Sequence, residues 1–452
     1  MKIFAACLLV AAAVALGLTT ANGGAAESVH RTLGAVRHRH VSAAHRMAAP
    51  RKAAGFTCGS SCSSYELAIN KYFTDVAAAS VAAATTNVYD VATQYCGGVA
   101  TLSTSCGGGG TPIAYNSAFG GAFVDGRPLP ASGCNDAVTI GFVSHADKYC
   151  LTDAQLQTEI ESVITAKKWP TDSTKLFFIF TPANVGVCQY PGNASNTNAC
   201  TTNVFCAYHS LTQSNIIYAV EPDDAQIPGG GCDPGQAPVG SGADATISTI
   251  SHEHNEAITD PLGGGWYAAD GSENGDLCAY NFGTPTGTAL NGQLYNQVIN
   301  GTDYWLQQEY SNADSGCLQQ PGGTVSPVIN GDGAGPLVYR GGTVMTTNTA
   351  YAIYWIPAVP ARTVLPKISG TPKVGKKLTA SRGAWTYSPK LTYRWLRCSS
   401  TGTLCKAIAK ATGSSHVLVK LDAGHRIAVR VTATNAAGSV SATSAPTRAV
   451  KK

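Results

Sequence analysis

The segment Asp244–Pro261, DATISTISHEHNEAITDP, decides how the rest of this chain is interpreted. Its apolar residues are spaced as on one face of a helix, and the proline and the glycines that follow predict where that helix ends. His252 and Glu256 are four residues apart, so both side chains reach the same point on a helix. Glu253 lies about 100° around the axis, where it can touch a water held at that point.

This spacing predicts a zinc site. It matches the His-Glu-x-x-His zinc helix with Glu256 in place of the second histidine, and carboxylate and imidazole are both ordinary zinc ligands. We therefore expect His252 and Glu256 to bind zinc and Glu253 to take a proton from a water. His254 faces away from the edge shared by these ligands and is expected to have no part in the site.

A third ligand is expected from the residues that follow the helix. Glu273, seventeen residues beyond Glu256, is the first candidate, and Asp260 is the alternative. Asp260 stands past the end of the helix, where it is expected to brace the turn. Asp276 is expected behind the ligands, accepting the free N–H of His252.

Tyr208 and His209 form a second candidate cluster, in the segment CAYHS. Either side chain near zinc could stabilise an oxyanion. The alternative is that both are ordinary buried residues with hydrogen-bond partners. A glycosidase is disfavoured, because the sequence shows no distinctive pair of carboxylates.

The N-terminus predicts export. Lys2 precedes an apolar run and then small residues, as in a signal peptide over residues 1–26, and the histidine- and arginine-rich residues 27–55 read as a disordered leader or propeptide. Fourteen cysteines remain, which predicts disulfides in a secreted, extracellular protein. Short loops close most readily, so neighbours are expected to pair: Cys58–Cys62, Cys96–Cys106, Cys134–Cys150, Cys188–Cys200, Cys206–Cys232, Cys278–Cys317 and Cys398–Cys405.

Charge is distributed very unevenly. Residues 56–320 carry a net charge of −18 and residues 321–452 carry +16, within a total of +4. This split predicts two bodies, and it disfavours nucleic-acid binding by the whole chain. The basic part could be attracted to the acidic one, anchor the protein on a cell wall or other anionic surface, or simply be solvated. No apolar run after the N-terminus is long enough to span a membrane.

The order of elements predicts two fold classes. Residues 56–320 mix helical and strand patterns, so we expect an α/β or α+β domain with a mixed sheet and an active-site helix. A linker over residues 321–337 follows, and residues 362–450 alternate strand-like runs with turns, as in an all-β sandwich. Helices are predicted over Tyr65–Ala79 and Asp153–Trp169, and strands over Asn87–Tyr95, Thr139–Val143, Leu176–Thr181 and Ile216–Val220.

Several segments resemble a known family. SHEHNEAITDPLGGGWY, GSENGDLC, CAYHS, INKYFTDVAAAS and YWLQQEYSN are similar to secreted bacterial proteins regarded as His-Glu-x-x-Glu metallopeptidases. That family is distantly similar to the plant exordium or phosphate-induced proteins. The resemblance covers most of residues 56–320 and implies a zincin-like catalytic domain. In the C-terminal part, LTYRWLRC and VRVTATNAAGS resemble an Ig-like repeat that is often appended to secreted bacterial proteins.

One segment departs from the order of that family. Val338–Pro357 resembles residues that usually open the catalytic region, but here it follows that region. Its apolar run Tyr351–Ile356 suits a strand buried on both faces. We therefore predict a permuted strand over residues 338–357, with ladder bonds from Ala350–Ile356 to a strand within residues 87–220. The alternative is a duplicate segment packed loosely on the surface.

Two functions stay open. The first is a secreted zinc endopeptidase that hydrolyses protein or peptide substrates with zinc-activated water and Glu253 as general base. The second is a non-catalytic extracellular or cell-wall binding or adhesion protein with a structural or vestigial metal site.

Overall fold

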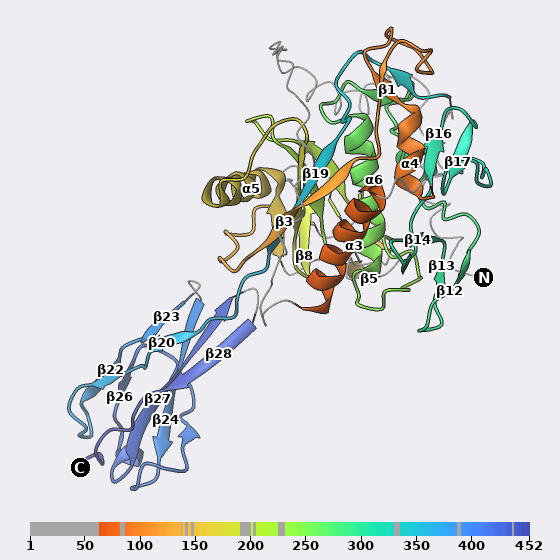
Figure 1. Ribbon diagram of the computed structural model, residues 1–452. Coiled ribbons are helices and arrows are strands. Elements are labelled where there is room, and N and C mark those ends of the chain that lie inside the picture. Colours follow the sequence, from red (N-terminus) through yellow and green to blue (C-terminus); the bar gives the residue numbers. More distant parts are fainter. Residues whose placement is uncertain are drawn as a thin grey trace, which may run out of the picture.

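The structure is a computed structural model that describes residues 63–81, 86–136, 138–140, 143–145, 149–189, 200–201, 205–224, 231–329, 335–386, 390–435 and 438–452. The predicted signal peptide, the leader and the Cys58–Cys62 pair lie outside the described residues. Within the described residues, a mixed α/β part is followed by a C-terminal all-β part (Figure 1).

A five-stranded sheet forms the centre of the α/β part, in the order β3-β19-β7-β10-β9. The first four strands run parallel to their neighbours, and β9 pairs antiparallel with β10 at one edge. The sheet is therefore mixed, as predicted. The bounds of its strands are Ser117–Asp125 (β3), Asn348–Trp355 (β19), Lys175–Phe180 (β7), Ile217–Glu221 (β10) and Tyr208–Leu211 (β9).

Both faces of this sheet are buried, which explains the near-continuous apolar runs of its central strands. Along β19, Ala352 and Tyr354 pack into one core, whereas Ile353 and Trp355 pack into another. Successive strand residues point to opposite faces, so one strand contributes to both cores.

Among the described residues, three long helices cover the two faces of the sheet. Helices α3 and α6 contribute to the core on one face and α5 to the core on the other, and Figure 1 shows α3 and α6 side by side in front of the sheet. Their bounds are Ser64–Val81 (α3), Asp153–Lys167 (α5) and Asp244–Thr259 (α6). The Thr152 side chain caps α5 in a capping box with Gln155.

The displaced strand lies in the middle of the sheet. Residues Ala350–Tyr354 pair in parallel with β7 on one side and with β3 on the other. Ile353 is 0% exposed and Trp355 is 4% exposed. The predicted insertion of Ala350–Ile356 beside strands within residues 87–220 is therefore confirmed, and loose packing on the surface is excluded. A circular permutation as its origin stays a prediction.

Three local predictions were wrong or incomplete. Residues 87–95 form no long strand: Asn87 caps a short helix, α4 (Val88–Val91), which a 3₁₀ turn follows at Ala92–Gln94. The capping box between Asn87 and Asp90 outweighs the strand-like composition. Leu67, whose place in the apolar pattern of the helix predicted over Tyr65–Ala79 indicates a buried side chain, is 53% exposed. The predicted strand over residues 139–143 is replaced by two short strands, β4 (Val138–Ile140) and β5 (Val143–His145).

Six disulfides join the described cysteines, and all six were predicted. They fit an extracellular protein in an oxidising environment. Among the described helices, none has both the length and the apolar character that a bilayer crossing requires.

Short two-stranded sheets complete the α/β part and extend its loops. They involve β1 (Cys96–Gly97), β2 (Thr111–Pro112), β6 (Tyr149–Thr152), β8 (Val185–Cys188), β11 (Trp266–Tyr267), β12 (Gly287–Thr288), β13 (Leu294–Tyr295), β14 (Gln297–Ile299), β15 (Thr302–Tyr304), β16 (Glu309–Ser311), β17 (Gly316–Leu318) and β18 (Val338–Tyr339).

The C-terminal part has no α-helix among its described residues, in agreement with the all-β prediction. Two sheets, β25-β24-β27-β28 and β21-β22-β26, enclose a small core around Trp395, and β20 pairs with β23. The Ig-like assignment stays a prediction. The strands are β20 (Arg362–Val364), β21 (Ile368–Ser369), β22 (Lys377–Ala380), β23 (Ala384–Trp385), β24 (Lys390–Cys398), β25 (Lys406–Ala407), β26 (Ser415–Val417), β27 (Arg426–Asn435) and β28 (Gly438–Thr443).

Candidate metal centre

Helix α6 carries the residues singled out in the sequence and is buried along most of its length. In the first turn of the helix, the carboxylate of Asp244 accepts hydrogen bonds from the backbone N–H groups of Val239 and Gly240, which fixes the turn that precedes the helix. At its end, Asp260 accepts the N–H groups of Gly264 and Gly265. Asp260 thus braces the turn through Oδ1, as expected, and it belongs to none of the groups of described residues that could hold a metal ion.

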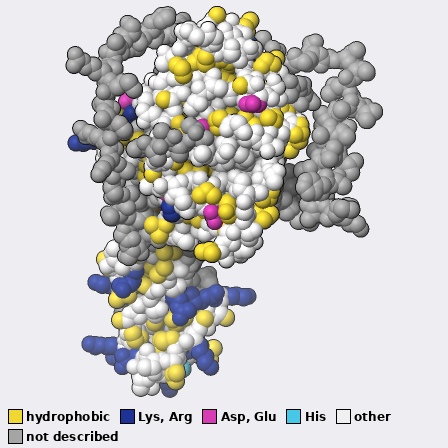
Figure 2. All heavy atoms as spheres, turned by 45° about the vertical axis from the view of Figure 1, so that its right-hand side comes forward, with side chains coloured by type: hydrophobic (Ala, Val, Ile, Leu, Met, Phe, Trp, Pro, Cys, Tyr) yellow, Lys and Arg dark blue, Asp and Glu magenta, His cyan; other side chains and the backbone are white. Residues whose placement is uncertain are grey.

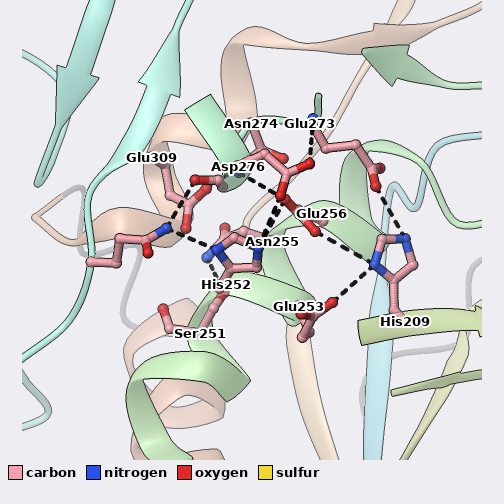
Figure 3. A network of polar contacts seen from close by, with 12 residues as sticks. His209, Ser251, His252, Glu253, Asn255, Glu256, Glu273, Asn274, Asp276 and Glu309 are labelled. Carbon is pink, nitrogen blue, oxygen red and sulfur yellow. Dashed lines mark hydrogen bonds and ion pairs between the residues drawn. The ribbon is translucent and has the colours of Figure 1, made fainter. Parts of the chain in front are cut away.

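One side of the candidate site is built around His252. Its Nε2 lies 3.1 Å from Oε1 of Glu256 and 3.7 Å from Oδ1 of Asp276. The backbone N–H of Asp276 donates to Oε1 of Glu256 over 2.9 Å. Figure 3 shows His252 and Asp276 converging on the same carboxylate of Glu256. The loop after α6 therefore covers the carboxylate of Glu256 through Asp276.

The other side is built around His209 on β9. Its Nδ1 lies 3.1 Å from Oε2 of Glu253 and 3.6 Å from Oε2 of Glu256. Its Nε2 lies 3.7 Å from Oε2 of Glu273. Figure 3 shows this imidazole facing all three carboxylates from across the site. The edge strand of the sheet thus brings a histidine to the helix, although His209 and His252 are 43 positions apart in the sequence.

Most of the predicted site residues come together, but not in the expected sets. Glu273 contacts His209 rather than joining His252 and Glu256, so the structure does not bring the three predicted ligands together. Asp276, expected behind the ligands, lies among them. Tyr208 points away, and its hydroxyl donates to Asp153 over 2.7 Å. Neighbouring residues of a strand face opposite sides, so His209 and Tyr208 cannot both line the site.

His254 has a structural role, as expected from its position on the helix. It is 1% exposed, its Nε2 lies 2.8 Å from Oδ1 of Asn348, and its Nδ1 lies 3.1 Å from the Tyr89 hydroxyl. Burial lowers the pKa of His254 to about 4, so the ring is neutral at neutral pH. The contact with Asn348 ties the site helix to the inserted strand β19.

Charges within the site favour the protonated form of both imidazoles. Burial lowers the pKa of His209, but the charge of Glu273 and the contacts with Glu253 and Glu256 outweigh burial and raise the pKa well above its usual value. Burial likewise lowers the pKa of His252, and neighbouring carboxylates, Glu256 first, raise it well above that value. Burial raises the pKa of Glu256, but the charges of the two histidines hold it well below its usual range. Protons therefore neutralise the carboxylates in the absence of a metal ion.

The donor atoms fit a divalent metal ion. Two triads share Glu256, and within each triad the ligand atoms lie within 4.8 Å of one another. Imidazole and carboxylate donors suit zinc, although they do not by themselves identify it. The triads are His209/Glu253/Glu256 and His252/Glu256/Asp276.

The surroundings of the triads add to this fit. The sequence has no Lys or Arg between Lys175 and Arg340 that could neutralise the carboxylates from nearby in the chain. Oε1 of Glu273 and Oε1 of Glu309 are buried and have no hydrogen-bond partner among the described residues. Burial raises the pKa of both carboxyl groups well above its usual value, and a bound cation would favour their ionised form.

Sequence reasoning missed the residues behind the ligands. Nε2 of Gln307 lies 2.8 Å from Nδ1 of His252 and donates to the Gly275 carbonyl over 2.9 Å. Asn274 donates from Nδ2 to Oε2 of Glu309 over 2.8 Å. Gln307 and Glu309 belong to the segment YWLQQEYSN, which resembles the family. Nothing in the spacing of this segment indicates contact with the helix, so neither residue was predicted in the site.

Gly275 is required by close packing. A Cβ built on Gly275 would lie 2.8 Å from Nδ1 of His252 and 2.9 Å from Oε1 of Glu256. Real Cβ atoms essentially never approach so closely, so any side chain at this position would displace both candidate ligands.

Comparison with known proteins gives one partial similarity. Protein EXORDIUM-like 3 of Arabidopsis thaliana is 29% identical over 187 residues, which cover 36% of this chain and 52% of the plant protein. The chain thus spans about half the length of that relative. This agrees with the predicted exordium resemblance at a coarse level, while the metallopeptidase family stays a prediction.

Two further comparisons add no family. No family model matches the chain. Among solved structures, the A168–A170 domains of titin are 19% identical and cover 26% of this chain and 45% of the titin chain, with a TM-score of 0.16. That score is too low to indicate a shared fold.

Proposed function

We propose that the protein is a secreted zinc-dependent endopeptidase with a zincin-like catalytic domain. The observation that carries the proposal is the set of His252, Glu253 and Glu256 on one helix, with both carboxylates buried and with Asp276 and His209 brought to it from a loop and a strand. The six disulfides support an extracellular location.

His252, Glu256 and Asp276 would hold the metal ion, because their ligand atoms already lie close together. Glu273, predicted from the sequence, would need to turn away from His209 to join them. When bound, zinc lowers the pKa of a water and polarises the carbonyl of the substrate.

Glu253 suits the role of general base. It is not part of the triad that would hold the metal, yet it follows His252 directly on the helix. Burial raises the pKa of Glu253, although the hydrogen bond with His209 lowers it, so its carboxylate is a better proton acceptor than an exposed one. His209, 3.1 Å away, would orient Glu253 and could pass a proton to the leaving amine.

The edge of the sheet supports a peptide substrate. Among the described residues strand β9 pairs only with β10, and no ladder bond is formed at its other edge, beside His209. An extended peptide can add to such an edge as a further strand. We expect chains that can form several ladder bonds to be better substrates than dipeptides.

The test is digestion of casein by the purified mature chain, with and without a chelator, together with metal analysis. Glu253→Gln is expected to keep one equivalent of zinc and lower the cleavage rate by at least about a hundredfold, because the general base is lost. Glu161→Gln, a matched change on α5 away from the site, should keep full activity.

Each outcome separates the two candidate functions. Full activity of Glu253→Gln would contradict the mechanism. Bound zinc without cleavage of any substrate tested would favour the extracellular or cell-wall binding protein with a structural metal site.

A further inference from the structure

The all-β part carries positive charge that its own fold does not neutralise. Residues 362–452 contain 17 Lys and Arg residues and a single acidic residue, Asp422. Asp422 is 0% exposed and lies 2.6 Å from Arg397 and 3.2 Å from His416. The other cations therefore have no carboxylate of this region to pair with, and Figure 2 shows Lys and Arg side chains gathered over it.

Two of these cations face each other across a ladder. The register of β24 and β27 places Arg394 opposite Arg430, and both residues are exposed. Neither guanidinium has a hydrogen-bond or ion-pair partner among the described residues. Like charges directly opposite each other destabilise an antiparallel pair. An anion between them would remove this cost and could bind both guanidinium groups by paired hydrogen bonds.

The two arginines line a hollow of about 590 Å³ on this face. Its other lining residues offer hydroxyl groups and one ring: Leu391, Thr392, Tyr393, Thr412 and Thr432. The hydroxyl surface continues onto β28, where Thr432 lies 2.8 Å from Ser441 and Thr434 lies 2.7 Å from Ser439. Hydroxyl groups can exchange hydrogen bonds with sugar hydroxyls.

We propose that this hollow, the β24–β27 groove, binds an anionic polysaccharide whose carboxylates lie between Arg394 and Arg430. A nucleic acid is a poorer fit, because single strands need several stacking rings, whereas the one aromatic residue of the lining, Tyr393, packs against the core. A membrane surface is a poorer fit, because the groove is lined mainly by hydroxyl and guanidinium groups rather than by exposed apolar side chains. The proposal is independent of the metal centre.

The test measures binding of the full mature chain to polygalacturonate, with neutral dextran as the reference polymer. Arg394→Gln/Arg430→Gln is expected to weaken binding at least about tenfold, because both charge-assisted contacts are lost. Arg448→Gln/Lys451→Gln removes the same charge from exposed positions outside the groove lining and should weaken binding less than about threefold. This pair separates a groove from a general effect of net charge.

A second variant keeps the charge unchanged. Thr392→Val/Thr432→Val removes two lining hydroxyls and should also weaken binding to polygalacturonate. The threonine variant provides the test if Arg394→Gln/Arg430→Gln does not fold. We expect the arginine variant to fold, because loss of a like-charge pair should leave its thermal unfolding midpoint unchanged or higher.

Three results would overturn the proposal. One is an equal loss in the arginine variant and its matched control, which would show that net charge alone is responsible. Another is equal binding of dextran and polygalacturonate. The third is tighter binding, dependent on Arg394 and Arg430, to duplex DNA or to anionic phospholipid vesicles than to polygalacturonate.

Discussion

At the scale of single residues, Glu256 is the centre of the candidate site. Its Oε1 faces His252 and its Oε2 faces His209, so one carboxylate joins the two histidines. The four-residue spacing predicted the first contact. The second depends on a strand that precedes the helix by more than thirty residues, and no sequence spacing indicated which face of that strand would turn inward.

Gln307 is expected to position His252 for metal binding. Gln307→Leu removes the amide that contacts Nδ1 of the ring, and loss of such a partner typically weakens metal affinity by roughly 10–100-fold. Titration of the metal-free chain with zinc against a competing chelator measures the change. Gln297→Leu, at a buried glutamine that bonds to Val88 and Gln319, is the matched control. Equal affinities in the two variants would show that Gln307 does not position the ring.

At the scale of elements, local sequence patterns predicted the long helices and the central strands well. Helices α3, α5 and α6 and strands β7 and β10 lie where periodicity and capping placed them. The short helix α4 was missed, because its composition resembles a strand and only the capping box of Asn87 and Asp90 shows otherwise. Such side-chain bonds to the backbone act over three or four residues and are easily hidden in an apolar stretch.

Asp90 in this capping box is expected to make stability depend on pH. Asp90 is 4% exposed, and burial raises its pKa to about 6, although the bond from the Asn87 N–H lowers it. In the unfolded chain an aspartate titrates near 3.9, so between about pH 4 and pH 6 the folded state binds more protons. The contribution of Asp90 to the free energy of unfolding is therefore greatest below about pH 4. It falls by roughly 2 kcal/mol as the pH rises to about 6.

Asp90→Asn should remove that loss, because the amide keeps an acceptor for Asn87 and carries no charge. Urea unfolding at pH 4.5 and pH 7.5 measures the effect. Between pH 4.5 and pH 7.5, the free energy of unfolding of the variant should rise by about 1–2 kcal/mol relative to that of the wild type. Asp270→Asn, on the exposed surface, is the control. The same pH dependence in wild type and Asp90→Asn would contradict the prediction.

At the scale of the whole molecule, disulfides hold the loops that complete the site. Cys278 follows the loop of Glu273 and Asp276, and its bond to Cys317 joins positions 39 residues apart. Cys278→Ala/Cys317→Ala is expected to lower the free energy of unfolding by about 3–4 kcal/mol and to weaken zinc binding. Calorimetry and the chelator titration measure the two effects.

The control is Cys398→Ala/Cys405→Ala, whose bond closes a separation of seven residues in the all-β part. Its effect on stability should be smaller, because a shorter loop loses less entropy, and zinc affinity should stay unchanged. Unchanged zinc affinity in the Cys278→Ala/Cys317→Ala variant would show that the bond does not hold the site loop.

The sequence by itself determined the features that depend on neighbours along the chain. These are the helix with His252, Glu253 and Glu256, the disulfides between successive cysteines, the apolar strands, and the contrast between an acidic and a basic part. Helix periodicity, loop closure and composition are local quantities, so a single sequence carries them.

Only the tertiary structure decided which distant side chains meet. It placed His209 beside Glu253, brought Asp276 rather than Glu273 to His252, turned Tyr208 away, and set Arg394 opposite Arg430. These pairings depend on strand order, register and the face that each residue presents. Strand order, register and facing depend on how both faces of the central sheet and the inner faces of the two sheets of the all-β part become buried. Many residues that are distant in the sequence contribute to this burial together.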